Sequence, residues 1–442
     1  MRNGGVGYAE SGLGAGAHAA TARSADNLRK VEAGCLRVGI IAACPFPADH
    51  GTPGGIREKA EALAELGHEV HVITYASHQP GHVRGVRIHR IAPVGPVHDI
   101  KVGPSKAKIF WDLQLVWKTI QVVRREKLDV IHGINYEGAM VGCLAKWVTG
   151  VPLVYGAVNT MADELHTYKF IWPPKLARVL ARILDWTVPR LADRAVCYTQ
   201  AIHDFLVSTG VPADRVDIIK LGIDLSMFKD ATPGDARRRL NVNGAPLIVY
   251  TGVLNKFQRI DYLLQAMRVV RRDLPDAKLA FVRTLDDEPQ RQEVEQMAEE
   301  EGVRDAVLFP EVISFGELPP YLAAADVTAI PRPDCPGVPV KLLNFMAAGR
   351  PIVVTRGSSQ GLRDRHEVLV VEDHNPEAMG QALVHVLRDK DLAKRLGRNA
   401  RAAAYAHYDR LATTVDLVVA YRKAMAAKDR VPQSAAVVMA QV

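Results

Sequence analysis

The segment PGVPVKLLNFMAAGRPIVVT combines a tight loop, a cation and the start of a helix. Gly337 and Pro339 favour the loop, and the backbone amides that follow, with Lys341 among them, would point toward an anion. The run at 352–355 is typical of a strand buried on both faces, and Gly349 stands where a helix end needs a left-handed residue. The pattern predicts an anion-binding loop, although an ordinary βαβ helix with a surface lysine would share it.

A second loop, ACPFPADHGTPGGIREKAEAL, places Gly51, Gly54 and Gly55 between the expected first strand and its helix. Glycine lets the backbone approach a ligand, and the amides of the helix start favour negative charge. The spacing is not GxGxxG, so it does not indicate a dinucleotide site. A simple turn between strand and helix is the alternative.

Polar residues also follow two later apolar runs. His132 and Glu137 come at the end of DVIHGINYEG, and Asn159 comes at the end of VYGAVNT. Residues in such positions line the crevice of an open α/β sheet. A histidine at a strand end is also often a hydrogen-bonded structural residue, so both interpretations of His132 stay open.

The elements that must position these residues form two similar series. Strand 36–43, a helix at 56–68 and strand 69–75 open a Rossmann-like unit. The first series continues with strands at 128–133, 152–157 and 194–199, and the second has strands at 247–252, 278–283, 306–310, 327–331, 352–355 and 367–372. We therefore expect an α/β protein with two doubly wound Rossmann-like domains.

Domain boundaries follow changes in composition. The first domain is expected at 35–228 and the second, with C-terminal helices, at 229–425. Residues 1–34 are rich in glycine and alanine without a continuous apolar stretch, which predicts a disordered extension. Residues 426–442 are expected to form a flexible tail.

Composition excludes several classes of function. The 442 residues are 48% hydrophobic and 24% charged, and no apolar run reaches the roughly 20 residues of a membrane span. The five cysteines lack CxxC spacing, which indicates a reducing, cytoplasmic compartment and no structural metal. The net charge of +7 favours an anionic partner, and no nucleic-acid-binding module is recognisable.

Two basic stretches, 106–127 and 169–186, combine tryptophan and aliphatic residues at helical spacing with lysine or arginine. Such helices can lie at an anionic membrane surface, so we expect peripheral contact with the inner face of the cell membrane. Ordinary packing with a solvated basic face is the alternative.

The first segment resembles the donor-binding element of retaining glycosyltransferase family 4, which has the GT-B fold. Residues shared with that element are Gly337, Pro339, Met346, Ala347, Gly349 and Pro351. The two usual glutamates are replaced by Pro336 and Asn344, and Lys341 fits a lysine-containing variant of the motif. The chain therefore resembles a divergent member of the family.

Other segments extend the resemblance over about residues 36–425. Residues that match family motifs include His132, Tyr136, Glu137, Gly138, Asn159, Thr160, Glu164 and Leu165, and 192–228 resembles the family's interdomain stretch. Family residues that face the sugar or grip the diphosphate are replaced by Ile134, Val158, Val253 and Gln258.

The resemblance implies two Rossmann-like domains that face each other across a cleft and transfer a sugar from a UDP- or GDP-sugar, without a metal or other cofactor. Donor-binding positions would be Gly54, Gly55, Lys256, Arg259, Arg283, Gly337, Val338, Pro339, Lys341 and Asn344. His132, Glu137 and Asn159 would face the acceptor and the sugar, and the acceptor would be a glycan precursor or a lipid-linked molecule. Two alternatives are an inactive GT-B protein that binds a sugar nucleotide or a partner enzyme, and a UDP-sugar epimerase.

Overall fold

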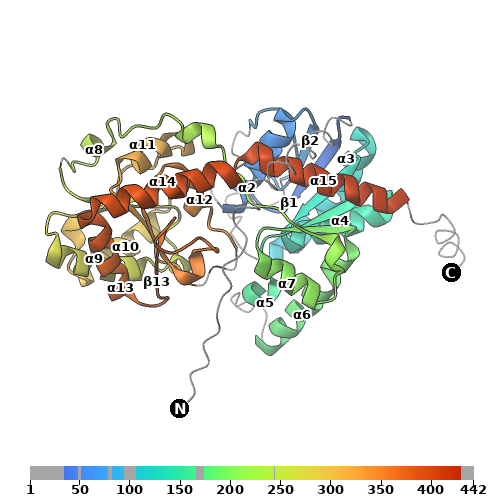
Figure 1. Ribbon diagram of the computed structural model, residues 1–442. Helices are drawn as coiled ribbons and strands as arrows, with labels where there is room; N and C mark the ends of the chain where they lie inside the picture. The colour runs from blue at the N-terminus through green and yellow to red at the C-terminus, as the bar shows by residue number, and fades with distance from the viewer. Residues whose placement is uncertain are drawn as a thin grey trace, which may run out of the picture.

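Two parallel β-sheets, each covered by helices, form the protein in the computed structural model (Figure 1). The structure describes residues 34–47, 51–77, 82–93, 106–165, 174–242, 244–333, 335 and 337–429. The two predicted terminal extensions fall almost entirely outside these residues. The expected α/β architecture with two Rossmann-like units is confirmed.

The first unit is a seven-stranded sheet in the order β3-β2-β1-β4-β5-β6-β7. Its strands and helices are β1 Arg37–Ala42, α2 Gly51–Glu65, β2 Glu69–Thr74, β3 Val86–Arg90, α3 Lys106–Glu126, β4 Val130–Ile134, α4 Asn135–Thr149, β5 Leu153–Ala157, α5 Met161–Glu164, α6 Pro174–Leu191, β6 Arg194–Cys197, α7 Gln200–Ser208 and β7 Val216–Ile218. Every residue of β4 and β5 is buried, which explains their continuous apolar runs.

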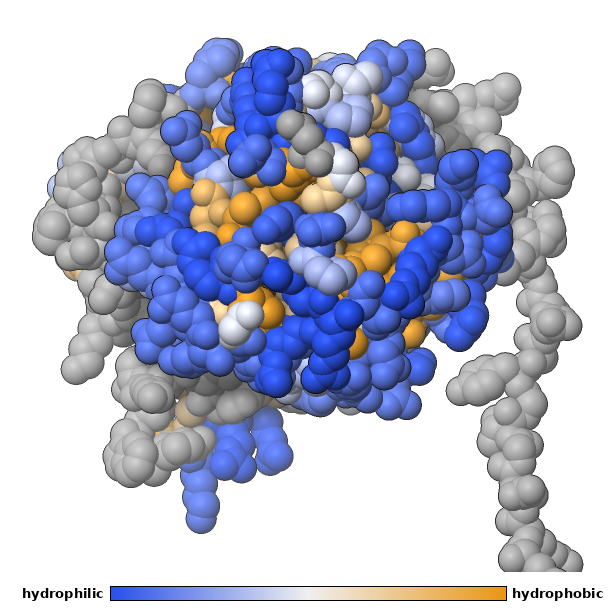
Figure 2. All heavy atoms as spheres, turned by 90° about the vertical axis from the view of Figure 1, so that its left-hand side faces the viewer, coloured by the Kyte–Doolittle hydropathy of each residue, from blue (hydrophilic) through white to orange (hydrophobic). Residues whose placement is uncertain are grey.

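The second unit is a six-stranded sheet in the order β10-β9-β8-β11-β12-β13. Its elements are α8 Ala236–Arg239, β8 Leu247–Thr251, α9 Ile260–Asp273, β9 Lys278–Val282, α10 Glu288–Glu300, β10 Val307–Leu308, α11 Leu318–Ala324, β11 Val327–Ile330, α12 Val340–Ala347, β12 Ile352–Thr355, β13 Leu369–Val371, α13 Pro376–Arg388, α14 Lys390–His407 and α15 Arg410–Asp429. The outward face of this unit is mostly hydrophilic, with hydrophobic residues visible in small areas between the charged side chains (Figure 2).

Local signals account for some boundaries and miss others. Gly349 adopts a φ of 67° just after α12, as its position predicted. Helix α2 begins at Gly51 and not at residue 56, so Gly54 and Gly55 lie within the helix and not in the loop before it. Strand β3 was not predicted because its residues are only partly buried at the sheet edge and carry no clear apolar pattern.

The last helix, α15, leaves the second unit and packs on the first, where it contacts α2 and the central strands (Figure 1). Val418 and Tyr421 are fully buried in the same core as Val38 and Ile40 of β1. Helices α3, α4 and α6 cover the opposite face of that sheet through a separate core. In the part of the chain that the structure describes, no helix is both long and apolar enough to cross a membrane.

Candidate functional site

Lys341 turns inward at the carboxyl edge of the second sheet. Its ammonium donates hydrogen bonds to Gln258 Oε1 at 2.9 Å and to the hydroxyl of Tyr250 at 2.5 Å. The same nitrogen lies 4.0 Å from the centre of the Tyr250 ring, a cation–π contact. Lys341 lies in the first turn of α12, just after the loop that contains Pro339, so the expected meeting of a cation with a helix start is present.

Arg332 adds a second cation beside Lys341. It follows β11 by two residues, and its guanidinium lies 4.9 Å from the ring centre of Phe257. Burial, and after it the positive charge of Arg332, lower the pKa of Lys341 to about 7. Sequence analysis missed Arg332, although its position just past a predicted strand end could have indicated it.

We call Tyr250, Gln258, Arg332 and Lys341 the Lys341 cluster. Asn344 stands one helical turn after the lysine and is 4% exposed. Its Oδ1 has no hydrogen-bond partner among the described residues. A buried carbonyl oxygen without a hydrogen-bond partner lowers the stability of the folded protein. This oxygen could therefore accept a hydrogen bond from a ligand that enters beside the cluster.

The other predicted donor cations are not gathered at the cluster. Lys256 is exposed and its ammonium pairs with Glu293 at 3.0 Å. Arg259 is held by the carboxylate of Asp261, with N–O distances of 3.0 Å and 2.7 Å. Both side chains therefore have partners away from Lys341.

Arg283 is buried at the end of β9, where its guanidinium donates to Asp287 Oδ1 at 3.3 Å. The other oxygen of that carboxylate accepts the amide of Leu254 at 3.3 Å. Arg283 therefore supports the loop after β8, which carries Gln258 of the Lys341 cluster. In the described structure its Nε has no hydrogen-bond partner.

The first unit meets the loop before α12 at Gly337. A Cβ on Gly337 would lie 3.3 Å from the carbonyl oxygen of Val158, which immediately follows β5. This close approach places Asn159, which is partly buried, beside the loop that leads into α12. Of the residues expected to face the sugar, Asn159 is thus next in sequence to a residue that contacts this loop.

Gly54 and Gly55 lie in the first turns of α2, which follows β1. The same end of α2 contacts the second unit, because the guanidinium of Arg57 lies 5.8 Å from the ring centre of Phe315. Glu137 is in the first turn of α4 and is partly exposed. These residues start helices at the carboxyl edge of the first sheet, where ligands of open α/β sheets bind.

His132 is fully buried within β4. Its Nδ1 lies 2.8 Å from the hydroxyl of Tyr421 on α15, and burial lowers the pKa of the ring to about 3. A Cβ at Gly156 would lie 2.7 Å from its Nε2, so neighbouring backbone closes the other side. The structure therefore supports the packing interpretation of His132, since the ring is covered on both sides.

One histidine pair lies outside the crevice. His71 Nδ1 and His89 Nε2 are 2.9 Å apart, and their ligand atoms and a Glu126 oxygen lie within 4.8 Å of one another. The ring centres are 5.2 Å apart with an interplanar angle of 16°, so the rings meet edge to edge through one hydrogen bond. The two rings are already paired with each other, and we assign no metal site.

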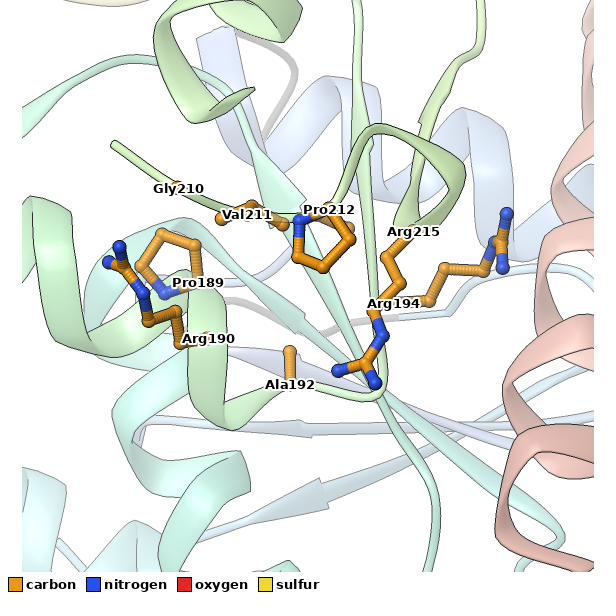
Figure 3. Close-up of a pocket in the computed structure, with 9 residues that line it drawn as sticks. Pro189, Arg190, Ala192, Arg194, Gly210, Val211, Pro212 and Arg215 are labelled. Carbon is orange, nitrogen blue, oxygen red and sulfur yellow. The ribbon is translucent and has the colours of Figure 1, made fainter. Parts of the chain in front are cut away.

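A hollow on the first unit is lined by Pro189, Arg190, Ala192, Arg194, Gly210, Val211, Pro212 and Arg215 (Figure 3). Its volume of about 250 Å³ is small for a nucleotide sugar. Arg190 donates to backbone carbonyl groups and Arg194 to Asp217, so both guanidinium groups already have partners. The hollow is therefore not assigned to the donor.

Comparison with known proteins connects both units to one family. Residues 51–222 match the glycosyl transferase 4-like domain, and residues 245–389 match the glycosyl transferases group 1 domain. The D-inositol 3-phosphate glycosyltransferase of Saccharomonospora viridis is 30% identical over 390 residues, which are 84% of this chain and 89% of that protein. The protein of the same name from Thermobispora bispora is 28% identical over 415 residues, covering 88% and 95% of the two chains.

Solved structures share the fold. The sucrose-phosphate synthase of Thermosynechococcus elongatus has a TM-score of 0.76 at 21% identity, covering 89% of this chain and all of that one. HepE of Anabaena, solved with UDP and glucose, has a TM-score of 0.70 at 16% identity, covering 87% and 98%. With two Rossmann-like units and these relatives, the chain belongs to the group 1 glycosyltransferases and is a glycosyltransferase of the GT-B fold.

Proposed function

We propose that the protein transfers a sugar from a UDP- or GDP-sugar to an acceptor, with retention at the anomeric carbon, as a divergent member of family 4. The observation that carries the proposal is the Lys341 cluster, where two cations and the start of α12 meet at the carboxyl edge of the second sheet. The neighbour HepE was solved with UDP and glucose, which supports a nucleotide sugar as the donor.

Breaking the bond between sugar and diphosphate places growing negative charge on the leaving group. Lys341 in its protonated form, Arg332 and the first amides of α12, with Gly337, Val338 and Pro339 leading into them, would stabilise that charge. Such stabilisation acts without a metal because the cations are already in place. The Oδ1 atom of Asn344 would accept a hydrogen bond from the donor ribose, in place of the family glutamate.

The acceptor would approach from the first unit. Asn159 lies beside the Gly337 loop, and Glu137, Gly54 and Gly55 start helices at the same edge of the first sheet. We propose a glycan precursor or a lipid-linked molecule as the acceptor. Contact with an anionic membrane is a separate proposal, because it depends on another surface.

The test combines thermal shift with turnover for a panel of UDP-, GDP- and ADP-sugars. A ligand that binds only the folded state raises its apparent stability, so one base should give a shift and the matching sugar nucleotide should be consumed. Lys341→Ala should lose the shift, whereas Lys256→Ala should keep it because that ammonium pairs with Glu293. Loss of the shift in both variants, or in neither, would mean that the donor site is misplaced.

An inactive protein that binds a sugar nucleotide is the second candidate. Val158 and Gln258 stand where the family usually has a histidine and a lysine, and Lys341 is already engaged by two partners. Calorimetry separates the two functions. Nucleotide binding by folded protein, without donor consumption for any acceptor or for water, would favour the binding protein.

A further inference from the structure

Helix α6 leaves most of its large apolar side chains exposed. Over its first three turns the residues that it buries are small or polar, namely Ala177, Ala181 and Asp185, and only near its end does it bury Val188. Five large apolar residues face outward and are each more than half exposed: Leu176, Val179, Ile183, Trp186 and Leu191. Surface helices normally bury their apolar stripe, so this stripe lacks the cover that its composition predicts.

Hydrogen bonds to Asp185 hold α6 in this orientation. Asp185 accepts the hydroxyl of Tyr136 and the backbone amides of Met161 at 2.9 Å and Ala162 at 3.0 Å. Rotating α6 to bury its apolar stripe would break all of these bonds and expose three donors to an apolar core. The stripe therefore stays outside while the contacts of Asp185 hold.

Neighbouring helices continue the apolar surface. Helices α3 and α6 both pack against α4 on this side of the sheet. Trp117 on α3 is 63% exposed and Trp147 on α4 is 88% exposed. We call the exposed apolar residues of the three helices the outer apolar surface: Phe110, Leu113, Trp117, Leu144, Trp147, Val148, Leu176, Val179, Leu180, Ile183, Trp186 and Leu191.

Positive charge borders this surface. Lys175, Arg178 and Arg182 are exposed along one flank of the α6 stripe, and in the described structure none of them pairs with a carboxylate. The single acidic residue of α6 is Asp185, which points inward. An apolar stripe with exposed tryptophan and a basic flank fits the boundary between lipid headgroups and acyl chains.

We propose that the outer apolar surface binds the face of a membrane that contains anionic lipid. The apolar side chains enter the headgroup region and the three basic side chains pair with lipid phosphates. A protein partner would need an acidic counterpart to the flank, and a second copy of this chain would bring equal basic flanks near each other. Charge complementarity therefore favours lipid over either protein. The proposal does not depend on the chemistry of the Lys341 cluster.

Flotation of the full chain with lipid vesicles tests the proposal. Vesicles of phosphatidylcholine mixed with phosphatidylglycerol should carry the protein upward, and vesicles of phosphatidylcholine alone should not. The double variant Arg178→Glu with Arg182→Glu should bind the mixed vesicles at least about tenfold more weakly. The triple variant Val179→Gln, Ile183→Gln and Trp186→Gln keeps every charge and should also lose binding.

A matched control changes the same charges elsewhere. Lys394→Glu with Arg395→Glu alters two exposed residues of α14 on the second unit and should leave vesicle binding unchanged. Circular dichroism and the donor-induced thermal shift should match the unaltered protein in all variants, which shows that they fold. Equal loss in this control would mean that only net charge matters, and the proposal would be wrong.

Two further results would overturn the proposal. One is folded, unaltered protein that stays with neither kind of vesicle. The other is a dimeric unaltered protein whose triple variant is monomeric and floats with vesicles as before. The outer apolar surface would then be a contact between copies of the chain. Light scattering after gel filtration reports the second result.

Discussion

The ammonium of Lys341 lies 2.9 Å from Oε1 of Gln258, the position at which the resemblance to family 4 motifs predicts a lysine. The positive charge expected at position 258 is thus supplied from α12, by a side chain that reaches the same place from another element. The replacement at position 258 is therefore accompanied by a cation in contact with it.

Replacing Lys341 should separate ligand binding from stability. Burial lowers the pKa of this ammonium, so the charged form costs the free protein stability that an apolar side chain would not cost. In Lys341→Met, Tyr250 can still donate to Gln258 Oε1, which lies 3.3 Å from its hydroxyl. We expect the free energy of unfolding to rise by about 1–3 kcal/mol while the donor-induced thermal shift disappears. Urea unfolding measures the first effect, and a less stable variant would contradict it.

Exchanging the side chains at positions 258 and 341 should reveal energetic coupling between them. Gln258→Lys alone would place a second ammonium against Lys341, and we expect a loss of about 1–3 kcal/mol from repulsion and burial. The double variant Gln258→Lys with Lys341→Gln should recover most of that loss and part of the donor affinity. Additive effects in this double-mutant cycle would mean that the two side chains act independently.

Donor affinity should fall as the solution becomes alkaline. The pKa of Lys341 in the free protein is about 7, and a bound diphosphate favours the protonated form, so binding takes up a proton above that pH. In the limit of full coupling the dissociation constant rises about tenfold for each pH unit above about 7. Calorimetry in buffers of different ionisation enthalpy would detect the proton uptake. Lys341→Met should abolish the uptake, and an unchanged signal would assign it to another group.

Acid should destabilise the protein partly through His132. Burial lowers the pKa of its ring to about 3 from 6.5, so the unfolded chain binds a proton that the folded chain does not. The stability that the neutral, buried ring contributes is fully present above the pKa of the ring in the unfolded chain. It is lost progressively as the pH falls toward the pKa of the ring in the folded protein. Between about pH 7 and about pH 5 the ring should account for a loss of about 2 kcal/mol. In His132→Phe, urea unfolding at the two pH values should show a smaller difference, whereas an equal difference would assign the acid sensitivity to other groups.

The sequence predicted the strands that are buried on both faces because their apolar runs are continuous, as in 352–355, and strand β12 has these bounds. It placed Gly349 correctly because only a left-handed residue suits that helix end. Edge strand β3 escaped because half-buried residues carry no such pattern. Strand β7 Val216–Ile218, at the other edge of the first sheet, was not predicted either. Local rules therefore gave the centres of the sheets and missed both edges of the first one.

Site residues were harder to predict because side-chain direction depends on contacts distant in sequence. Lys341 turns toward Gln258, which is far away along the chain, and Lys256 turns outward toward Glu293 although it is close to Gln258 in sequence. His132 matched a motif but is covered by Tyr421 of the last helix. A motif gives the position of a residue on an element, and the partner that meets it decides its role.

The return of α15 to the first sheet also sets an order for the folding of the chain. Val418 and Tyr421 complete the core between β1 and α2, so that core stays incomplete until the last helix has left the ribosome. Domains usually fold as units from the amino terminus during synthesis. Here the core of the first unit is completed only after the second unit has been synthesised.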